Sequence, residues 1–236
     1  MNEQLKTMIQ LQGYWDIILK NKESAEKLKK RIYDYHDDLK IKSGTIKEII
    51  NSIKNLRNKI KNHELDLAEK DAKYKKIIDR KEHIKSEREL YAQKIEIEKL
   101  ELQRNELENG LIDNFDELEA LENSLTDTEK SYAGDEQIAK EEIEKLHTHI
   151  GLNEKKISDY EIKFNGIIDT ILPPYRSKFL KLLQSKNGTA IGEINGEVCS
   201  CCNFQIPSYL VTEAGMSDKV VNCTNCGRFI YKSITK

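Results

Sequence analysis

The sequence predicts a mainly α-helical fold, in which a long kinked antiparallel coiled-coil hairpin is followed by a small β domain. The first 172 residues contain no proline, since the three prolines lie at positions 173, 174 and 207, and they are rich in Lys, Glu, Leu and Ile. Such a stretch is typical of long helices. Charged residues make up 34% of the chain and aromatic residues only 7%, which argues against one large globular core.

Apolar residues recur at alternating spacings of three and four along two runs of the chain. The first run extends from Ile18 to Ile84 and the second from Ile97 to Ile171. This spacing is the signature of the buried seam between supercoiled helices. A few polar residues interrupt the seam, where they weaken packing but fix its register: Asn21, Lys42, His63, Lys70 and Asn114.

The three-four spacing of the second run is out of phase with that of the first, and the segment between the two runs contains a signal for the start of a helix. Ser86 and Glu89 have the spacing of a capping box, so a second helix is expected to begin at Ser86. We predict a hairpin tip near 84–91, which makes residue i face roughly residue 178 − i. Residues 20–62 contain 13 Lys or Arg and 6 Asp or Glu, whereas residues 116–158 contain 5 and 12. These opposite charges favour antiparallel pairing within one chain over a parallel dimer.

Glycines predict a kink partway along the hairpin. Gly44 faces Gly134 under the same mirror relation, and paired glycines are a common cause of bending. Thr45, with Glu48 three residues later, also predicts that a helix restarts there.

Composition changes at Pro173 and Pro174, which we take as the domain boundary because helices tend to end before a proline. The predicted parts are a coiled-coil hairpin over 1–172, a linker or short helix over 173–188, and a metal-binding β domain over 189–236. Within the last part, Asn195-Gly196 between β-forming residues predicts a type I′ hairpin.

Four of the five cysteines form two pairs, Cys199-x-x-Cys202 and Cys223-x-x-Cys226, with 20 residues between the pairs. Each turn can direct two sulfurs at one metal ion, and two such turns complete a tetrahedron. Four thiolates favour zinc or an iron–sulfur centre, and the spacing resembles a zinc ribbon. We predict one structural Zn²⁺, because a four-cysteine site leaves no open position for substrate. Two disulfides are the alternative, which a cytoplasmic setting disfavours.

The other candidate reactive residues predict no catalysis. Cys201 is expected to be a thiol that binds no metal and can lie at the surface. His63 is expected to fix the register of the seam. His147 and His149 are two apart, so on a helix they face different ways. The sequence has no glycine-rich phosphate loop and no His-Glu-x-x-His motif, so an enzyme is not expected. It also has no apolar run long enough for a membrane span and no signal-peptide pattern over 1–20, which predicts a soluble, cytoplasmic protein.

These features resemble a bacterial family that joins a long coiled-coil hairpin to a C-terminal four-cysteine zinc ribbon. The resemblance covers nearly the whole chain. It is most specific at Lys85–Leu90 (KSEREL), at the first cysteine pair with Pro207 beyond it, and at 223–231 (CTNCGRFIY). The KSEREL string is most similar to the flagellar-biogenesis member. The resemblance implies a cytoplasmic, non-enzymatic adaptor or chaperone whose partners are the flagellar sigma factor, export-apparatus components and a flagellin mRNA.

A general nucleic-acid-binding zinc-ribbon protein unrelated to flagella is the alternative. From position 175 onward the chain has 8 Lys or Arg against 4 Asp or Glu, and Tyr209, Phe229 and Tyr231 offer rings for stacking on bases. Equally, Phe229 and Tyr231 can fill a small apolar core, in which case the lysines only keep the domain soluble. The candidate RNA-binding residues are Lys219, Arg228, Lys232, Arg176, Lys178 and Lys181. The first three flank the second cysteine pair and are expected to point outward from so small a core.

Overall fold

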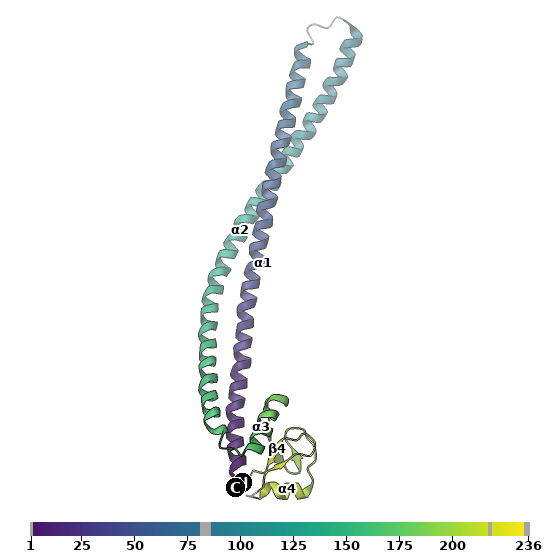
Figure 1. Ribbon diagram of the computed structural model, residues 1–236. Coiled ribbons are helices and arrows are strands. Elements are labelled where there is room, and N and C mark those ends of the chain that lie inside the picture. Colours follow the sequence, from purple (N-terminus) through teal and green to yellow (C-terminus); the bar gives the residue numbers. More distant parts are fainter. Residues whose placement is uncertain (1, 81–85, 217–218, 234–236) are drawn as a thin grey trace. The chain divides into compact units, whose positions relative to one another are not determined.

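The computed structural model describes residues 2–80, 86–216 and 219–233, and it confirms the predicted fold class. Two long helices pack together, and a small strand-rich region holding the four cysteines follows them (Figure 1). The helices are α1 (Glu3–Arg80), α2 (Glu87–Ile168), α3 (Pro173–Ser185) and α4 (Ser208–Gly215), and the strands are β1 (Ile191–Asn195), β2 (Val198–Cys199), β3 (Val221–Asn222) and β4 (Phe229–Tyr231).

The chain divides into two compact units, which are described separately below. The hairpin unit is Asp34–Glu141, and the ribbon unit combines Met1–Tyr33 with Glu142–Lys236. In each unit a stretch of α1 runs alongside a stretch of α2 in the opposite direction (Figure 1).

Ion pairs in the hairpin unit show the predicted register. Lys42 pairs with Asp135, and the Arg57 guanidinium lies 2.7 Å from Glu122. Their residue numbers add up to 177 and 179, close to the predicted 178. In both pairs the cation is on α1 and the carboxylate on α2, as the opposite charges of the two segments predict. Exposed pairs contribute only about 0–1 kcal/mol each, so their main effect is on register.

Apolar seam residues form the core of the hairpin unit, with one polar pair among them. Leu56, Ile60 and Leu111 are buried together. Asn114 is only 3% exposed, and its amide nitrogen lies 3.2 Å from Nδ1 of His63. Two polar residues predicted to fix register therefore meet each other, which satisfies the buried amide and disfavours slipped pairings.

The predicted helix restart near Gly44 is wrong. α1 continues through Gly44, and the Thr45 hydroxyl donates to the Ile41 carbonyl one turn back instead of capping a new helix. α2 is equally continuous through Gly134, so the glycines are accommodated within the helices, and the kink itself stays a prediction. α2 begins directly after Ser86, as the capping box predicts. The remainder of the predicted tip includes residues 84 and 85, which lie outside the described residues.

The core of the ribbon unit joins both ends of the sequence. The first turns of α1 pack against the end of α2, against α3 and against strands β1 and β4 (Figure 1). Burial of these side chains attaches the small domain to the helices. The buried members of this cluster are Leu5, Met8, Leu11, Phe164, Ile168, Ile171, Phe179, Leu182, Leu183, Ala190, Ile191 and Phe229.

The sheet of the ribbon unit has the order β2-β1-β4-β3. β1 pairs antiparallel with β2 and parallel with β4, and β3 pairs antiparallel with β4. The predicted turn type is wrong. Asn195 pairs with Val198, so the central residues are Gly196 and Glu197, and only Gly196 has a positive φ, of 62°. Type I′ requires a positive φ at both central positions, whereas type II′ has glycine at the first.

The segment after the first cysteine pair contains a helix that the sequence analysis did not predict. α4 follows Pro207 and buries Leu210, Val211 and Ala214 in one cluster with strand residues and with Cys199 and Cys223. These three residues are one and then three positions apart, which places their side chains on one face of the helix. The predicted short helix after Pro173 is present as α3.

Candidate metal centre

The four predicted ligands come together in the ribbon unit. The Sγ atoms of Cys199, Cys202, Cys223 and Cys226 all lie within 4.8 Å of one another, and none forms a disulfide. The Cys202 and Cys223 sulfurs are 3.7 Å apart. A tetrahedral ion with metal–sulfur bonds of about 2.3 Å keeps its sulfurs roughly 3.8 Å apart. The cluster therefore fits one four-coordinate metal ion.

Matching backbone turns position the two cysteine pairs. In the first, the Asn203 amide donates to the Cys199 carbonyl over 2.9 Å, and in the second, the Gly227 amide donates to the Cys223 carbonyl over 2.9 Å. Asn203 and Gly227 each follow the second cysteine of their pair, and their φ angles are 55° and 73°. Glycine adopts a positive φ without strain, and asparagine is among the other residues that tolerate this conformation best.

The thiols differ in their protein environment. Burial raises the pKa of the Cys199 thiol to about 12 and also raises the pKa of Cys223. Burial acts in the same direction on Cys202, but hydrogen bonds from the Phe204 amide and from neighbouring side chains lower its pKa to about 6. A bound metal ion replaces the thiol protons and holds the sulfurs as thiolates.

Cys201 is not part of this four-sulfur cluster and packs against β1. It is half-buried, and its Sγ lies 3.7 Å from the Ile191 carbonyl oxygen. A Cβ atom added at Gly192 would lie 2.5 Å from that sulfur. Cys201 lies outside the group of four cysteines, as predicted, and its half-buried side chain packs over Gly192.

A buried glutamine that the sequence analysis missed connects α1 to the start of the ribbon. The Gln12 amide nitrogen donates to the Gly188 carbonyl over 2.7 Å, and its oxygen accepts from the Ala190 amide over 2.8 Å. Gly188 has a φ of 79°, and an added Cβ would lie 2.1 Å from Leu19. The backbone that leads into β1 is therefore held by two hydrogen bonds to Gln12 and by close packing at Gly188. Because Gln10 and Asp16 nearby are also polar, nothing in the local sequence distinguishes Gln12.

The six candidate RNA-binding residues have different environments. Arg228 does not point outward as expected, because its guanidinium donates to the backbone carbonyls of Thr189 and Lys186. Arg176 pairs with Asp169, and Lys219 lies 2.8 Å from Glu213. The ammonium group of Lys178 lies 5.4 Å from the centre of the Phe229 ring, and Lys181 and Lys232 are exposed.

The candidate stacking rings also separate. Phe229 is fully buried and Tyr231 packs partly buried against the same core, which matches the alternative that they fill it. Tyr209 is 64% exposed, and Phe204, which was not singled out from the sequence, is 43% exposed. Within the described parts of the chain, no helix is both long and apolar enough to cross a bilayer.

Solved structures with this fold include CT398 from Chlamydia trachomatis, with a TM-score of 0.86 and 19% identity over 98% of this chain and 98% of that chain. The HP0958 protein from Helicobacter pylori gives a TM-score of 0.70 and 20% identity, again over 98% of each chain. A protein from Mycobacterium smegmatis gives 0.57 and 13%, over 99% of this chain and 100% of that chain. At these identities the likeness concerns the fold. No protein-family model and no curated protein matches the sequence.

Proposed function

We propose that this chain is a cytoplasmic, non-enzymatic adaptor or chaperone of flagellar biogenesis. Its paired helices bind protein partners, namely the flagellar sigma factor and components of the export apparatus. The observation that carries the flagellar part is the KSEREL string at Lys85–Leu90, combined with a hairpin and a four-cysteine cluster in one chain. The protein-binding part is supported by the two long helices, whose outward faces carry many charges and several exposed apolar side chains.

The metal in this proposal is one structural Zn²⁺ held by Cys199, Cys202, Cys223 and Cys226. Four thiolates without an open position suit zinc in a structural role. The ion would hold the two cysteine turns together across a cluster that also contains Ile206 and Ile230. It would thereby stabilise a region too small to fold on apolar burial alone.

Gene deletion tests the flagellar assignment. Loss of the protein should reduce motility and flagellin level, and a copy of the intact gene should restore both. Unchanged motility and flagellin in the deletion strain would refute the assignment. Affinity capture of the intact protein from its own cells, with and without nuclease, then separates direct protein partners from those held through RNA.

A contribution of the ribbon to RNA binding is the second candidate function, with flagellin mRNA as the proposed message. It is favoured by exposed lysines on α3 and at the end of β4, together with the exposed ring of Tyr209. Binding of this kind is dominated by phosphate contacts and falls steeply with salt. The triple variant Lys181/Lys186/Lys232→Ala should weaken RNA binding and give a shallower salt slope.

The matched control for this variant removes three exposed lysines from the hairpin unit, Lys59, Lys61 and Lys75, and should leave RNA binding unchanged. Arg228 is left intact in both variants because its guanidinium holds the backbone of the ribbon. Equal RNA affinity of the ribbon variant and the wild type would show that these lysines only keep the domain soluble.

A further inference from the structure

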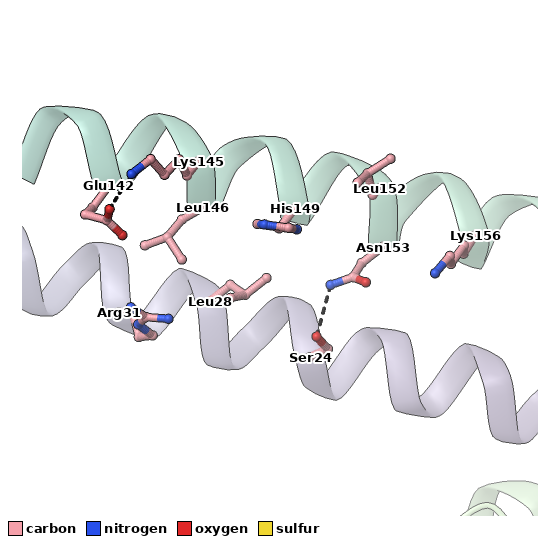
Figure 2. Close-up of a pocket in the computed structure, with 10 residues that line it drawn as sticks. All are labelled: Ser24, Leu28, Arg31, Glu142, Lys145, Leu146, His149, Leu152, Asn153 and Lys156. Atoms are coloured by element: carbon pink, nitrogen blue, oxygen red, sulfur yellow. Dashed lines mark hydrogen bonds and ion pairs between the residues drawn. The ribbon is translucent and has the colours of Figure 1, made fainter.

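A groove with a volume of about 480 Å³ lies between α1 and α2 inside the ribbon unit (Figure 2). Leu28 from α1 and Leu146 from α2 are among its lining residues, and Leu146 is 4% exposed, so the bottom of the groove is apolar. Leu152, at 52% exposure, adds an apolar side chain to its border. The groove therefore has an apolar floor that is bordered by polar and charged side chains.

The groove has a local cause in the sequence of the seam. At this level the facing seam positions are Ala25 and Asn153, which are smaller or more polar than the usual seam residues. The Asn153 amide donates to the Ser24 hydroxyl across the two helices over 3.1 Å (Figure 2). Because no large apolar side chain fills the seam here, space remains beside Leu28.

The charged residues that line the groove are mostly basic. Arg31, Lys145 and Lys156 carry positive charge, whereas Glu142 is the single carboxylate among the lining residues. Its charge is compensated within the groove, since Lys145 lies 2.7 Å away. The hydrogen bond and charge of Lys145, followed by the charge of Arg31, hold the pKa of Glu142 below its ordinary value. The lining as a whole thus has a surplus of positive charge.

We propose that this groove binds an acidic amphipathic helix of a partner protein, which would pack as a third helix against α1 and α2. A helix with apolar residues at i, i+3 or i+4, and i+7 would place them on Leu28 and Leu146, as helices do in other grooves. Acidic residues on its flanks would face Arg31 and Lys156. The apolar floor favours a helix over RNA, because phosphate groups gain nothing from leucine side chains. This inference rests on the proposed protein-binding function and specifies the chemistry of the partner.

Binding of synthetic peptides to the intact, metal-loaded protein tests the proposal independently of flagella. One labelled helical peptide carries leucines along one face with glutamates on its flanks, and a second replaces those glutamates with lysines. Fluorescence anisotropy should show binding of the acidic peptide and not of the basic one. The groove variant Arg31→Glu/Lys156→Glu should weaken binding by about tenfold or more, which corresponds to about 1.4 kcal/mol.

The matched control reverses two exposed lysines that lie one residue away from those positions, Lys30→Glu/Lys155→Glu, and should keep wild-type affinity. Circular dichroism checks that both variants keep the wild-type helical signal. The proposal is overturned if the acidic peptide does not bind, if both peptides bind equally, or if the control variant loses as much affinity. It is also overturned if a single-stranded RNA displaces the peptide from the groove.

Two further outcomes distinguish this inference from its alternatives. If sedimentation shows a dimer that the groove variant dissociates, the occupant is a second copy of this chain and the proposal fails. If a partner captured from cells binds the groove variant and the wild type equally, the adaptor function stands and the groove is not its site. Loss of that partner with the groove variant alone supports the proposal.

Discussion

Gln12 offers the sharpest test of how the ribbon is attached to α1. Replacing Gln12 with Met keeps a similar volume but removes the two bonds that its amide makes to the ribbon backbone, at the Gly188 carbonyl and the Ala190 amide. Gln12 is 8% exposed, so little water is available to replace them. Leaving a buried backbone group unpaired costs about 1–3 kcal/mol, so the two together predict a loss of roughly 2–6 kcal/mol in the free energy of unfolding.

Trp15 is the natural reporter for this experiment because the chain has a single tryptophan. Its ring lies against Phe164, with the ring centres 5.5 Å apart, and borders the space above Gly188. Urea unfolding followed by tryptophan fluorescence should therefore measure the ribbon unit. The matched control is Gln10→Met, which removes an exposed bond to the Tyr14 hydroxyl within the same helix.

The control should change the free energy of unfolding by less than about 0.5 kcal/mol, the usual range for surface substitutions. Gln12→Glu should be at least as harmful as Gln12→Met at neutral pH. It loses the donation to the Gly188 carbonyl and places a carboxylate beside Asp16, which the Gln12 amide contacts at 2.7 Å. If Gln12→Met matches the control, the two hydrogen bonds do not hold the ribbon and the reasoning is refuted.

Three other results are expected. Cys223→Ser should release zinc, as measured by elemental analysis, and should loosen the ribbon, because metal binding and local folding are linked. The helical signal of the coiled coil should barely change. Full zinc retention in the variant, or iron in the wild type, would contradict this prediction. Gly192→Ala should lower the thermal midpoint because its new Cβ meets the Cys201 sulfur, and Cys201→Ala should restore much of the loss; no restoration would mean that another contact is responsible. Cysteines at Ile60 and Leu118 should crosslink within one chain at low concentration, and crosslinks only between chains would mean that the paired helices belong to different chains.

Periodic and spacing patterns made the helices and the ligand set predictable from sequence. The seam residues Ile53, Leu56, Ile60 and Leu111 are buried as the three-four spacing requires. The cysteine spacing predicted four ligands that the structure brings within reach of one ion. Both inferences depend on local geometry, since the helical repeat and the Cys-x-x-Cys turn are determined by residues close together in the chain.

Patterns without strong periodicity were harder to interpret. α4 is short, and its buried residues had no repeat long enough to reveal it among the turn-forming residues around it. The turn at Gly196 and the outward direction assigned to Arg228 were wrong for related reasons. The turn type depends on which residues of the two strands pair, and the direction of the Arg228 side chain depends on carbonyl groups about 40 positions earlier in the chain.

The sequence by itself determined the helical hairpin, its approximate register and the identity of the four candidate metal ligands, because each follows from a short-range repeat or from charge arranged along one element. Only the tertiary structure decided how the first turns of α1 join the ribbon. Leu5, Met8 and Leu11 share a core with Phe229, and Gln12 bonds to residues 188 and 190. These contacts connect positions more than 170 residues apart, and no local spacing rule relates such positions, since their meeting depends on how every intervening element packs.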